Sequence, residues 1–453
     1  MEKNGLQALA RGFFAAGARL YGVGGMVRNP LLGLPVSDLD VTSALEPEKV
    51  MALCQEKGWK WVPKGVDFGM VEIHGAGVVC EHTTFRADTY GPGGGHRPRA
   101  VSFSTSLEAD AFRRDFTVNA LYQDLLTGEI FDPTGGLQDL KAGVLRATSP
   151  DPALIMGEDA LRVLRLARFA GELGFQIHPE TGAAAARFAG GLQDISGERV
   201  RDELSRILLG DVKYGKAGAV YRGLSLLEGL GGLDVILPEL ARGRGIRQRA
   251  EFHAYDVLSH CLHAAGEAEA AGGLPLRLGA LLHDVGKPIA LEKNGRMLGH
   301  DRLGAPVARD ILGRLRFPRA VAEEVVFLVK NHMFDLNGQA KESTLRRRFA
   351  QWGPERTEQL IRLRRADIRG SGRGSSEKTA DRWARVLGEM RAQAVPFTQE
   401  ELAIDGRDLM EALGRAPGPW LGALKEALHQ HCIQHPQDNR RDKLLRLAEK
   451  LME

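Results

Sequence analysis

Two glycines and two aspartates near the amino terminus have the spacing expected of a nucleotide and metal site. Gly24 and Gly25 follow a short apolar run, and the helix predicted after them carries Arg28 in its first turns. Glycines let backbone amides approach a triphosphate closely, and a helix start and an arginine both donate N–H groups to an anion. Asp38 and Asp40 lie two residues apart in a predicted strand, so both carboxylates project from one face and suit Mg²⁺. Two metal ions held in this way activate a 3′-hydroxyl and neutralise departing pyrophosphate, so the segment indicates nucleotidyl transfer.

A second polar series lies on the helix predicted over residues 157–174. Asp159 and Arg162 are three residues apart, and as neighbours on a helix they present a carboxylate acceptor and a guanidinium donor together. Cytosine and adenine offer an amino donor beside a ring-nitrogen acceptor, whereas uracil and guanine offer the reverse. The pair therefore favours selection of C and A. Arg165 and Arg168 continue the series, although at about 100° per residue Arg168 would lie roughly opposite Asp159.

Histidines and aspartates suited to a metal ion are concentrated between residues 253 and 370. Imidazole and carboxylate groups from different helices can hold a divalent ion together. One histidine, an adjacent His-Asp pair and a distant aspartate form the pattern, and two further histidines are candidates to join it. The four candidate ligands are His260, His283, Asp284 and Asp367, and the additional pair is His300 and His332.

Each of these fragments taken alone has a plainer interpretation. A Gly-Gly pair is usually a turn, and charged residues three apart on a helix usually form a surface ion pair of little energetic value. A lone histidine on an apolar helix face is usually a core residue. The order and number of the motifs within one chain favour the chemical interpretation.

The elements that must position these residues change character along the chain. Residues 1–147 alternate short β-branched runs, such as 78–84, with glycine-rich turns, which predicts an α+β region with a small mixed sheet. From Pro152 onward apolar residues recur at helical spacing, so the remainder is expected to be all α-helical. The expected divisions are 1–147, 148–210, 211–250, 251–370 and 371–453.

Composition limits the remaining alternatives. The chain has 453 residues, which is long for a single hydrophobic core and predicts several domains. Its 61 Lys and Arg against 58 Asp and Glu give a net charge of +3, too small to indicate a nucleic-acid partner without a local basic surface. The four cysteines form no CxxC pair, which argues against a zinc finger. With no signal peptide and no apolar run of about 20 residues, the expected location is the cytoplasm, away from membranes.

The motifs resemble those of class II tRNA nucleotidyltransferases and bacterial poly(A) polymerases that carry an HD domain. The resemblance rests on residues 20–44, on RRDFTVNALYQD at 113–124, on EDxxR at 158–162 and on the histidine region. It implies a polymerase-beta-like head over residues 1–147, with Mg²⁺ at Asp38 and Asp40 and with Arg114 at the nucleotide phosphates. It also implies a neck over residues 148–210 that recognises CTP and ATP and a tRNA as the acceptor.

The same resemblance assigns the other segments. Residues 81–98 would form a strand and a flexible loop, 195–210 a structural helix, 211–250 a helical connection and 371–453 a tail that contacts tRNA. The HD domain, 251–370, would bind Mn²⁺, Ni²⁺ or another divalent ion and hydrolyse phosphate esters such as 2′,3′-cyclic phosphate ends. Asn29 departs from the family, which usually has Asp after the arginine, and we expect altered local hydrogen bonding rather than lost activity.

The sequence leaves several functions open. The leading one is addition of CCA to tRNA, and enzymes that add only CC or only A can carry the same head and neck motifs. A bacterial poly(A) polymerase is the nearest rival, although the intact Glu158-Asp159-x-x-Arg162 element and the HD region favour a tRNA enzyme. A metal phosphohydrolase or RNA-binding protein with an inactive head is the alternative of another class, and the intact Asp38 and Asp40 argue against it. Neither the order of addition nor the oligomeric state follows from the sequence.

Overall fold

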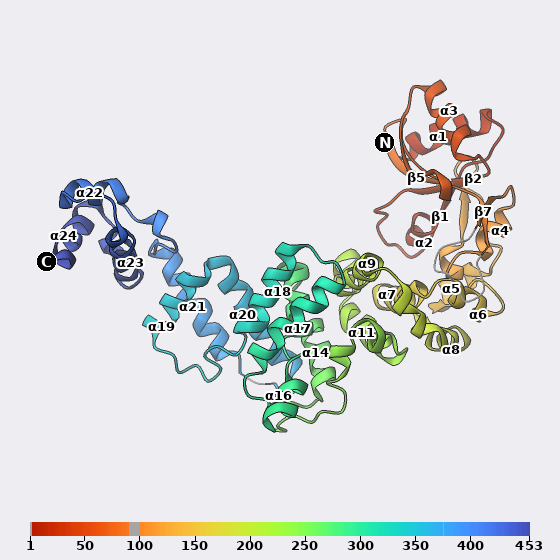
Figure 1. Ribbon diagram of the computed structural model, residues 1–453. Helices are drawn as coiled ribbons and strands as arrows, with labels where there is room; N and C mark the ends of the chain where they lie inside the picture. Colours follow the sequence, from red (N-terminus) through yellow and green to blue (C-terminus); the bar gives the residue numbers. More distant parts are fainter. Residues whose placement is uncertain (1, 90–99, 375) are drawn as a thin grey trace. The chain divides into compact units, whose positions relative to one another are not determined.

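The chain forms two compact units in the computed structural model, which describes residues 2–89, 100–374 and 376–453 (Figure 1). The units are Met1–Pro238 and Glu239–Glu453. The first contains all the strands found in the described residues, and the second is helical. The α+β prediction is confirmed, with a small mixed sheet in the amino-terminal region followed by helices.

The first unit is built on a seven-stranded sheet with the order β3-β4-β5-β2-β1-β8-β9. Neighbouring strands are antiparallel except β2 and β5, which are parallel and place Asp40 beside Glu81. The strand predicted over residues 78–84 is β5, with its bounds unchanged. The strands are β1 (Tyr21–Val23), β2 (Asp40–Ser43), β3 (Lys60–Gly65), β4 (Met70–Gly75), β5 (Val78–Thr84), β8 (Tyr122–Asp124) and β9 (Ile130–Phe131).

Two helices, α1 (Glu2–Ala15) and α3 (Pro47–Lys57), cover one face of this sheet (Figure 1). Burial alternates along β4 and β5 as the period of two requires, so every second side chain packs against the helices. Phe13 of α1, Leu53 of α3 and Ile73 of β4 belong to the resulting core. This layer supports the central β2–β5 pair, on which Asp40 and Glu81 are neighbours.

Shorter elements complete the head around the sheet. Helix α2 (Gly25–Leu31) follows β1 directly, and Ser106 caps α4 (Leu107–Phe112) by accepting from the Ala109 N–H at 3.1 Å. Strands β6 (Arg86–Thr89) and β7 (Ala100–Phe103) pair antiparallel, and β10 (Val144–Leu145) pairs parallel with β11 (Gln176–Ile177). Helix α5 (Gly136–Ala142) precedes β10. The flexible loop predicted within 81–98 falls mostly on residues 90–99, outside the described residues.

The neck region is a layer of helices centred on α7 (Leu161–Leu173). Helix α7 packs against α9 (Gly197–Leu208) and α11 (Ala219–Gly229). Gly171 permits the close approach to α11, since a Cβ there would lie 2.7 Å from the Ala219 carbonyl oxygen. The other helices are α6 (Pro152–Glu158), α8 (Pro179–Phe188), α10 (Gly210–Tyr214) and α12 (Gly232–Ile236), while α13 (Pro238–Ala241) spans the division between the units.

The second unit has two apolar cores. One surrounds Trp383 and Phe349 and includes buried residues of α14, α15 and α18 to α21, and the other is formed by α22, α23 and α24 around Leu409 and Leu428. The helices are α14 (Val257–Glu267), α15 (Gly273–Leu282), α16 (Lys287–Asn294), α17 (His300–Arg314), α18 (Arg319–Asn331), α19 (Glu342–Trp352), α20 (Pro354–Gly370), α21 (Lys378–Ala392), α22 (Gly406–Leu413), α23 (Pro419–Gln434) and α24 (Arg441–Met452).

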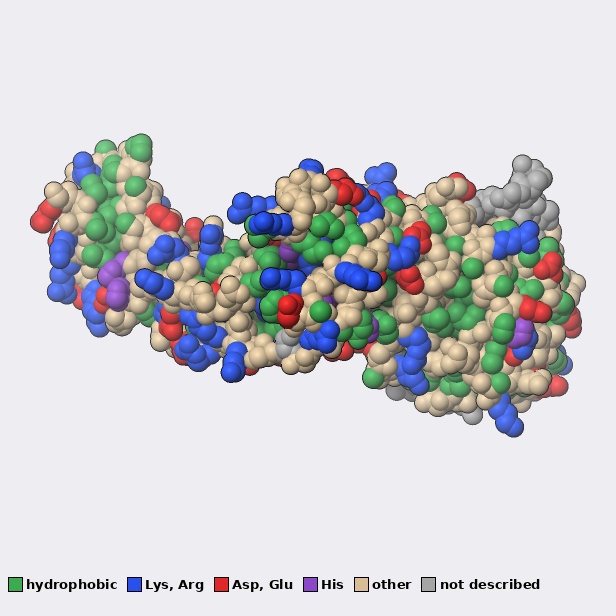
Figure 2. All heavy atoms as spheres, turned by 90° about the horizontal axis from the view of Figure 1, so that it is seen from below, with side chains coloured by type: hydrophobic (Ala, Val, Ile, Leu, Met, Phe, Trp, Pro, Cys, Tyr) green, Lys and Arg blue, Asp and Glu red, His purple; other side chains and the backbone are tan. Residues whose placement is uncertain are grey.

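The surface carries its charges in a dispersed pattern. On the face shown in Figure 2, Lys and Arg side chains lie in separate groups among acidic and apolar ones. That face therefore has no single large basic patch in the part of the chain that the structure describes. Among the described residues, no helix combines the length and the apolar character needed to cross a membrane.

Candidate nucleotide and metal sites

All ten residues predicted to bind the nucleotide or its metal line one cavity of about 700 Å³ in the first unit. The cavity lies between the β1–α2 turn, the β2–β5 strand pair and the neck helices. The lining residues from the prediction are Gly24, Gly25, Arg28, Asp38, Asp40, Arg114, Asp159, Arg162, Arg165 and Arg168. Segments more than 120 residues apart in the chain thus meet in one site.

The carboxylates of Asp38, Asp40 and Glu81 form the acidic side of the cavity. Strand β2 begins at Asp40, so Asp38 lies just before the strand rather than on it, which corrects the sequence prediction. Asp38 accepts from Ser37 Oγ at 2.7 Å and lies 3.7 Å from Lys213 Nζ. Burial and the neighbouring Asp38 raise the pKa of Asp40, while burial and Asp40 raise the pKa of Glu81. Carboxylates that oppose one another's ionisation are stabilised by a cation placed among them.

The glycine turn after β1 brings the backbone close to these carboxylates. Gly24 has φ +63° and ψ −128°, and a Cβ built there would lie 3.9 Å from Asp40 Oδ2. A side chain at this position would be strained and would stand beside Asp40, so the turn requires glycine.

Arg28 and Asn29 form a buried polar pair on α2. Arg28 donates to the side-chain oxygens of Asn29 and Asn119, and its guanidinium lies 5.1 Å from the centroid of the Phe169 ring. Asn29 Nδ2 donates to the Pro35 carbonyl at 2.8 Å and to Tyr214 Oη at 3.1 Å. An ionised aspartate at position 29 would have no proton to donate to Pro35.

Arg114 lies at the cavity wall on a buried acidic anchor. Its Nε donates to Tyr122 Oη at 2.9 Å, and its Nη2 lies 3.1 Å from Asp110 Oδ2. Although burial alone would raise it, the guanidiniums of Arg114 and Arg113 lower the pKa of Asp110 to about 2. Arg114 therefore keeps a fixed position and its charge.

The helix predicted over residues 157–174 is interrupted at Asp159, which separates α6 from α7. Asp159 is extended, with φ −147° and ψ 104°, and its Oδ1 accepts from the Leu161 N–H at 3.1 Å. Its Oδ2 accepts from Arg199 Nη2 at 2.5 Å. Asp159 and Arg162 are therefore not an i, i+3 pair on one helix. Asp159 lies between α6 and α7, and its side chain accepts from the backbone at the start of α7.

Arg162 is largely committed to the protein itself. Its Nη1 donates to the Ile155 carbonyl at 2.6 Å and to Glu158 Oε2 at 2.8 Å. Its Nη2 donates to the Arg113 carbonyl at 2.8 Å. These bonds hold the α6–α7 break against the head and leave two of the five guanidinium N–H groups for other acceptors.

Arg165 and Arg168 point from α7 into the cavity and are held by carboxylates. Arg165 Nη2 lies 2.5 Å from Asp115 Oδ2, and Arg168 Nε lies 2.7 Å from Glu203 Oε2. On one continuous helix Arg168 would lie roughly opposite Asp159. That expectation does not apply, since α7 begins only after Asp159 and no continuous helix connects the two residues. Arg168 also lies 4.0 Å from the centroid of the Phe169 ring, which packs its guanidinium plane.

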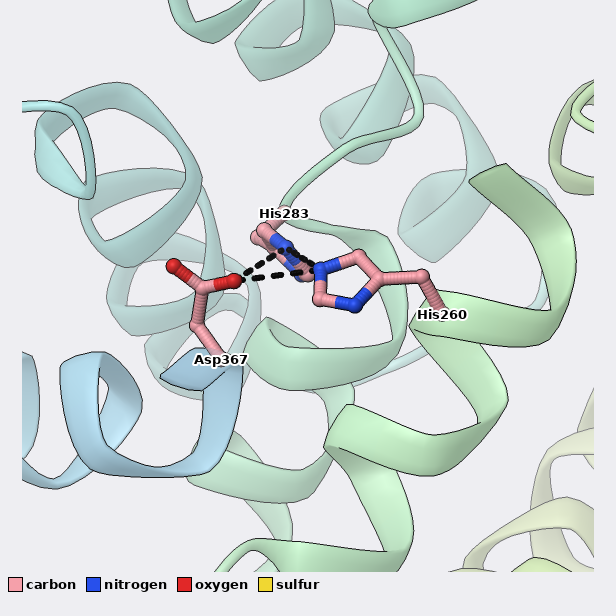
Figure 3. Close-up of side chains that lie close together, drawn as sticks. All are labelled: His260, His283 and Asp367. Carbon is pink, nitrogen blue, oxygen red and sulfur yellow. Dashed lines mark hydrogen bonds and ion pairs between the residues drawn. The ribbon is translucent and has the colours of Figure 1, made fainter. Parts of the chain in front are cut away.

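The histidine region gathers all six predicted ligands in the core of the second unit. Figure 3 shows His260 of α14, His283 at the end of α15 and Asp367 of α20 directed at one another. His260 Nε2 lies 3.1 Å from both His283 Nε2 and Asp367 Oδ1. A second group contains Asp284 with His300 and His332, whose Nε2 atoms are 3.0 Å apart.

Asp284 lies between the two groups. Its Oδ2 is 3.2 Å from His283 Nε2, and its Oδ1 is 3.1 Å from His300 Nε2. In each of the four histidines Nδ1 lies within hydrogen-bond distance of a backbone carbonyl, which fixes the ring and turns Nε2 towards the cluster. Although burial opposes the charge, Asp284 and Asp367 raise the pKa of His283 to about 10. A divalent metal that binds here displaces such a proton, and the neutral imidazoles and buried carboxylates then form a suitable donor set.

Comparisons with known proteins identify the family of the chain. Family models match as "Poly A polymerase head domain" over residues 20–146, "Probable RNA and SrmB- binding site of polymerase A" over 174–243, and "HD domain" over 257–369. The A-adding tRNA nucleotidyltransferase of Deinococcus radiodurans is 38% identical over 345 residues, 72% of this chain and 76% of that protein. The Multifunctional CCA protein of Xanthomonas campestris pv. campestris is 35% identical over 405 residues, 86% of this chain and 93% of that protein. The chain belongs to the tRNA nucleotidyltransferase family.

Solved structures of this nucleotidyltransferase family share the fold. The CCA-adding enzyme of Bacillus stearothermophilus in complex with CTP has a TM-score of 0.74 and 26% identity, with 99% of this chain and 96% of that chain covered. The Thermotoga maritima CCA-adding enzyme complexed with tRNA has a TM-score of 0.61 at 18% identity, covering 99% and 95% of the two chains, and shows likeness of fold alone.

Glu81 and Arg199 line the cavity of this nucleotidyltransferase and Glu203 contacts its arginines, yet the sequence did not assign these three residues to the nucleotide site. Glu81 joins Asp40 through the parallel β2–β5 register, and no local pattern distinguishes it from other polar strand residues. Arg199 and Glu203 are one turn apart on α9, in the segment predicted to be structural, and they hold Asp159, Arg165 and Arg168. The i, i+4 spacing of Arg199 and Glu203 was the only signal, and it does not reveal partners on another helix.

Proposed function

We propose that this chain adds C and A to the 3′ end of tRNA from CTP and ATP, without a nucleic-acid template. The observation that carries the proposal is the meeting, in one cavity, of the Asp38–Asp40 carboxylates with the Asp159 and arginine side chains of the neck. The first group suits phosphate chemistry and the second suits reading of a base. The relative solved with CTP supports the same substrate class.

The acidic side of the cavity fits Mg²⁺, because Asp38, Asp40 and Glu81 offer only hard oxygen donors beside space for phosphate. When bound there, Mg²⁺ supplies positive charge opposite the reacting phosphate. Arg28 and Arg114, which also line the cavity, offer N–H donors to the triphosphate. Their buried anchors keep both guanidiniums in place before the nucleotide arrives.

Asp159 would select the base. Its ionised carboxylate only accepts hydrogen bonds, so it pairs with the amino group of C or A and faces a like acceptor in U or G. Arg162, Arg165 and Arg168 supply donors for the ring nitrogen and the phosphates. Unpaired buried acceptors cost about 1–3 kcal/mol each, enough to discriminate between bases.

The proposal divides the chain by task. Residues 1–147 carry out transfer, 148–210 recognise the nucleotide, and 211–250 connect the helical parts. Residues 251–370 hold the second metal site, and 371–453 contact tRNA.

The decisive experiment follows incorporation of each radiolabelled NTP, singly and in pairs, into tRNA transcripts that end before CCA, after C and after CC. An unstructured RNA is the control. Addition of CC and then A, followed by arrest, is the expected result. Addition of C alone or A alone identifies a partial enzyme, long A tails on the control RNA identify a poly(A) polymerase, and no incorporation refutes the proposal.

A second activity is favoured by the position of Asp284 between two ligand groups. We propose that the cluster holds two divalent ions, Mn²⁺ or Ni²⁺ among them, one at His260, His283 and Asp367 and the other at His300 and His332, with Asp284 shared. The resemblance to HD domains indicates hydrolysis of phosphate mono- or diesters such as 2′,3′-cyclic phosphate ends. Lys287, whose Nζ lies 2.5 Å from Asp284 Oδ2, adds a cation for the ester.

Metal content tests this second proposal directly. The full chain is incubated with Mn²⁺ or Ni²⁺, desalted and analysed by mass spectrometry, and more than one ion per chain is expected. D284N should lose metal at both groups, whereas D310N, at an exposed aspartate of α17, should retain it. Absence of bound metal in the wild-type chain, or full retention in D284N, refutes the shared site.

A further inference from the structure

The Asp159 carboxylate is held from two sides before any nucleotide binds. The Leu161 N–H occupies one oxygen at 3.1 Å, and Arg199 Nη2 occupies the other at 2.5 Å. Asp159 lies in extended backbone between two helices, and the Leu161 N–H belongs to its own segment. Arg199 therefore restrains the rotation of this carboxylate from a different segment, helix α9.

Helix α9 presents Arg199 and Glu203 one turn apart on the side that faces α7. Glu203 is buried and holds Arg168 at 2.7 Å, with Arg165 3.7 Å away. Arg199 and its partner Asp159 are more accessible, with side-chain exposures of 34% and 16%. The buried residue anchors α9 against α7, and the accessible one reaches the cavity beside the base-reading carboxylate.

We propose that Arg199 is a positioning residue that sets base discrimination by fixing Asp159 as a hydrogen-bond acceptor. This inference rests on the proposed nucleotide addition and extends it. A carboxylate has about four acceptor positions, more than the bonds from Leu161 and Arg199 occupy, and Asp159 lines the cavity. Without Arg199 the carboxylate rotates about its side-chain bonds. Its acceptor oxygen is then no longer held against the carbonyl oxygen of uracil or guanine, so these bases are rejected less strongly.

The charge of Arg199 adds to this effect. Its guanidinium balances the negative charge of Asp159, which otherwise faces a triphosphate of the same sign in a partly buried site. Lysine at this position would retain the charge but lose the planar, two-pronged geometry. The proposal therefore predicts an intermediate effect for lysine and a larger one for a neutral side chain.

The test compares kcat/KM for CTP and UTP in the full chain, on a tRNA transcript ending before CCA. R199Q is expected to lower the CTP-to-UTP ratio by about tenfold, with R199K between R199Q and the wild type. R201Q is the matched control, since Arg201 is on the same helix, pairs with Asp202 and does not line the cavity. Its ratio should equal that of the wild type. Thermal unfolding of each variant establishes that it is folded.

The outcomes separate this inference from the function on which it rests. A wild-type chain that incorporates neither CTP nor ATP into any of the tRNA transcripts refutes the nucleotide addition itself. An active wild type with an unchanged CTP-to-UTP ratio in folded R199Q, or equal losses for both nucleotides, refutes the positioning role and indicates a phosphate contact or a structural role. If R199Q does not fold, R199K decides, because an unchanged ratio there overturns the proposal.

Discussion

Replacing Glu203 by glutamine should loosen the neck. The Glu203 side chain is 4% exposed and lies against three arginines, at 2.7 Å from Arg168 Nε, 3.1 Å from Arg206 Nη1 and 3.7 Å from Arg165 Nη1. Glutamine keeps the shape but removes the negative charge on which these cations converge. Positive charges are then left close together at a buried position, which destabilises the folded state.

The magnitude follows from the partners that remain. Removing one member of a buried ion pair costs about 3–5 kcal/mol. Arg168 retains Glu172 at 3.2 Å and Arg165 retains Asp115 at 2.5 Å, so neither is abandoned completely. We expect a loss of about 2 kcal/mol, which lowers the melting temperature of a unit of this size by about 4–8 °C.

Calorimetry of the full chain measures the shift, and hydrogen exchange locates it. The amide protons of α7 should lose protection, since α9 holds this helix through Glu203. The control is E198Q, an exposed glutamate on α9, which should change stability by less than about 0.5 kcal/mol. If E203Q is as stable as E198Q, the desolvation of the ion cluster cancels its attraction, and the argument that Glu203 holds the neck together is wrong.

Three further predictions concern the sheet, the helix packing and the carboxylate of Asp40. The buried His82, which shares a 2.7 Å hydrogen bond with Ser43 Oγ, has its pKa lowered by burial to about 3. The unfolded chain takes up this proton below about pH 6.5 and the folded chain does not, so stability falls as pH drops from 6.5 towards 3, by up to about 1.4 kcal/mol per pH unit. H82Q should remove this part of the slope in denaturant titrations, and a parallel slope would contradict the assignment. Gly171→Ala should destabilise the neck by about 1–3 kcal/mol by thermal melting, while Gly190→Ala, with nothing within 4 Å of its Cβ, serves as control, and equal stability would refute the close-contact argument. D40N should lower incorporation at least about a thousandfold without loss of thermal stability, because burial and Asp38 already oppose ionisation there, and retained incorporation would exclude Asp40 from the metal site.

Local patterns in the sequence were sufficient for many elements of this protein. The β-branched run at residues 78–84 predicted β5, because branched side chains favour extended backbone. The glycine pair predicted the turn after β1, since only glycine adopts φ +63° there without strain. The His-Asp pattern predicted histidines that the fold does bring together in one cluster, because ligand residue types are rare on apolar helix faces.

The sequence failed where local and distant interactions compete. Residues 157–174 have an uninterrupted helical pattern, yet the Asp159 side chain caps the Leu161 N–H and breaks the helix while Arg199, forty residues away, holds the other oxygen. A period of 3.6 residues contains no information about such a partner. The sequence therefore determined the residue types and elements of both sites. Tertiary structure alone decided that Glu81 lies beside Asp40, that α9 holds the arginines of α7 and that Asp284 faces two ligand groups. Each of these depends on contacts between segments that are distant in the sequence, and distance along the chain does not determine distance in space.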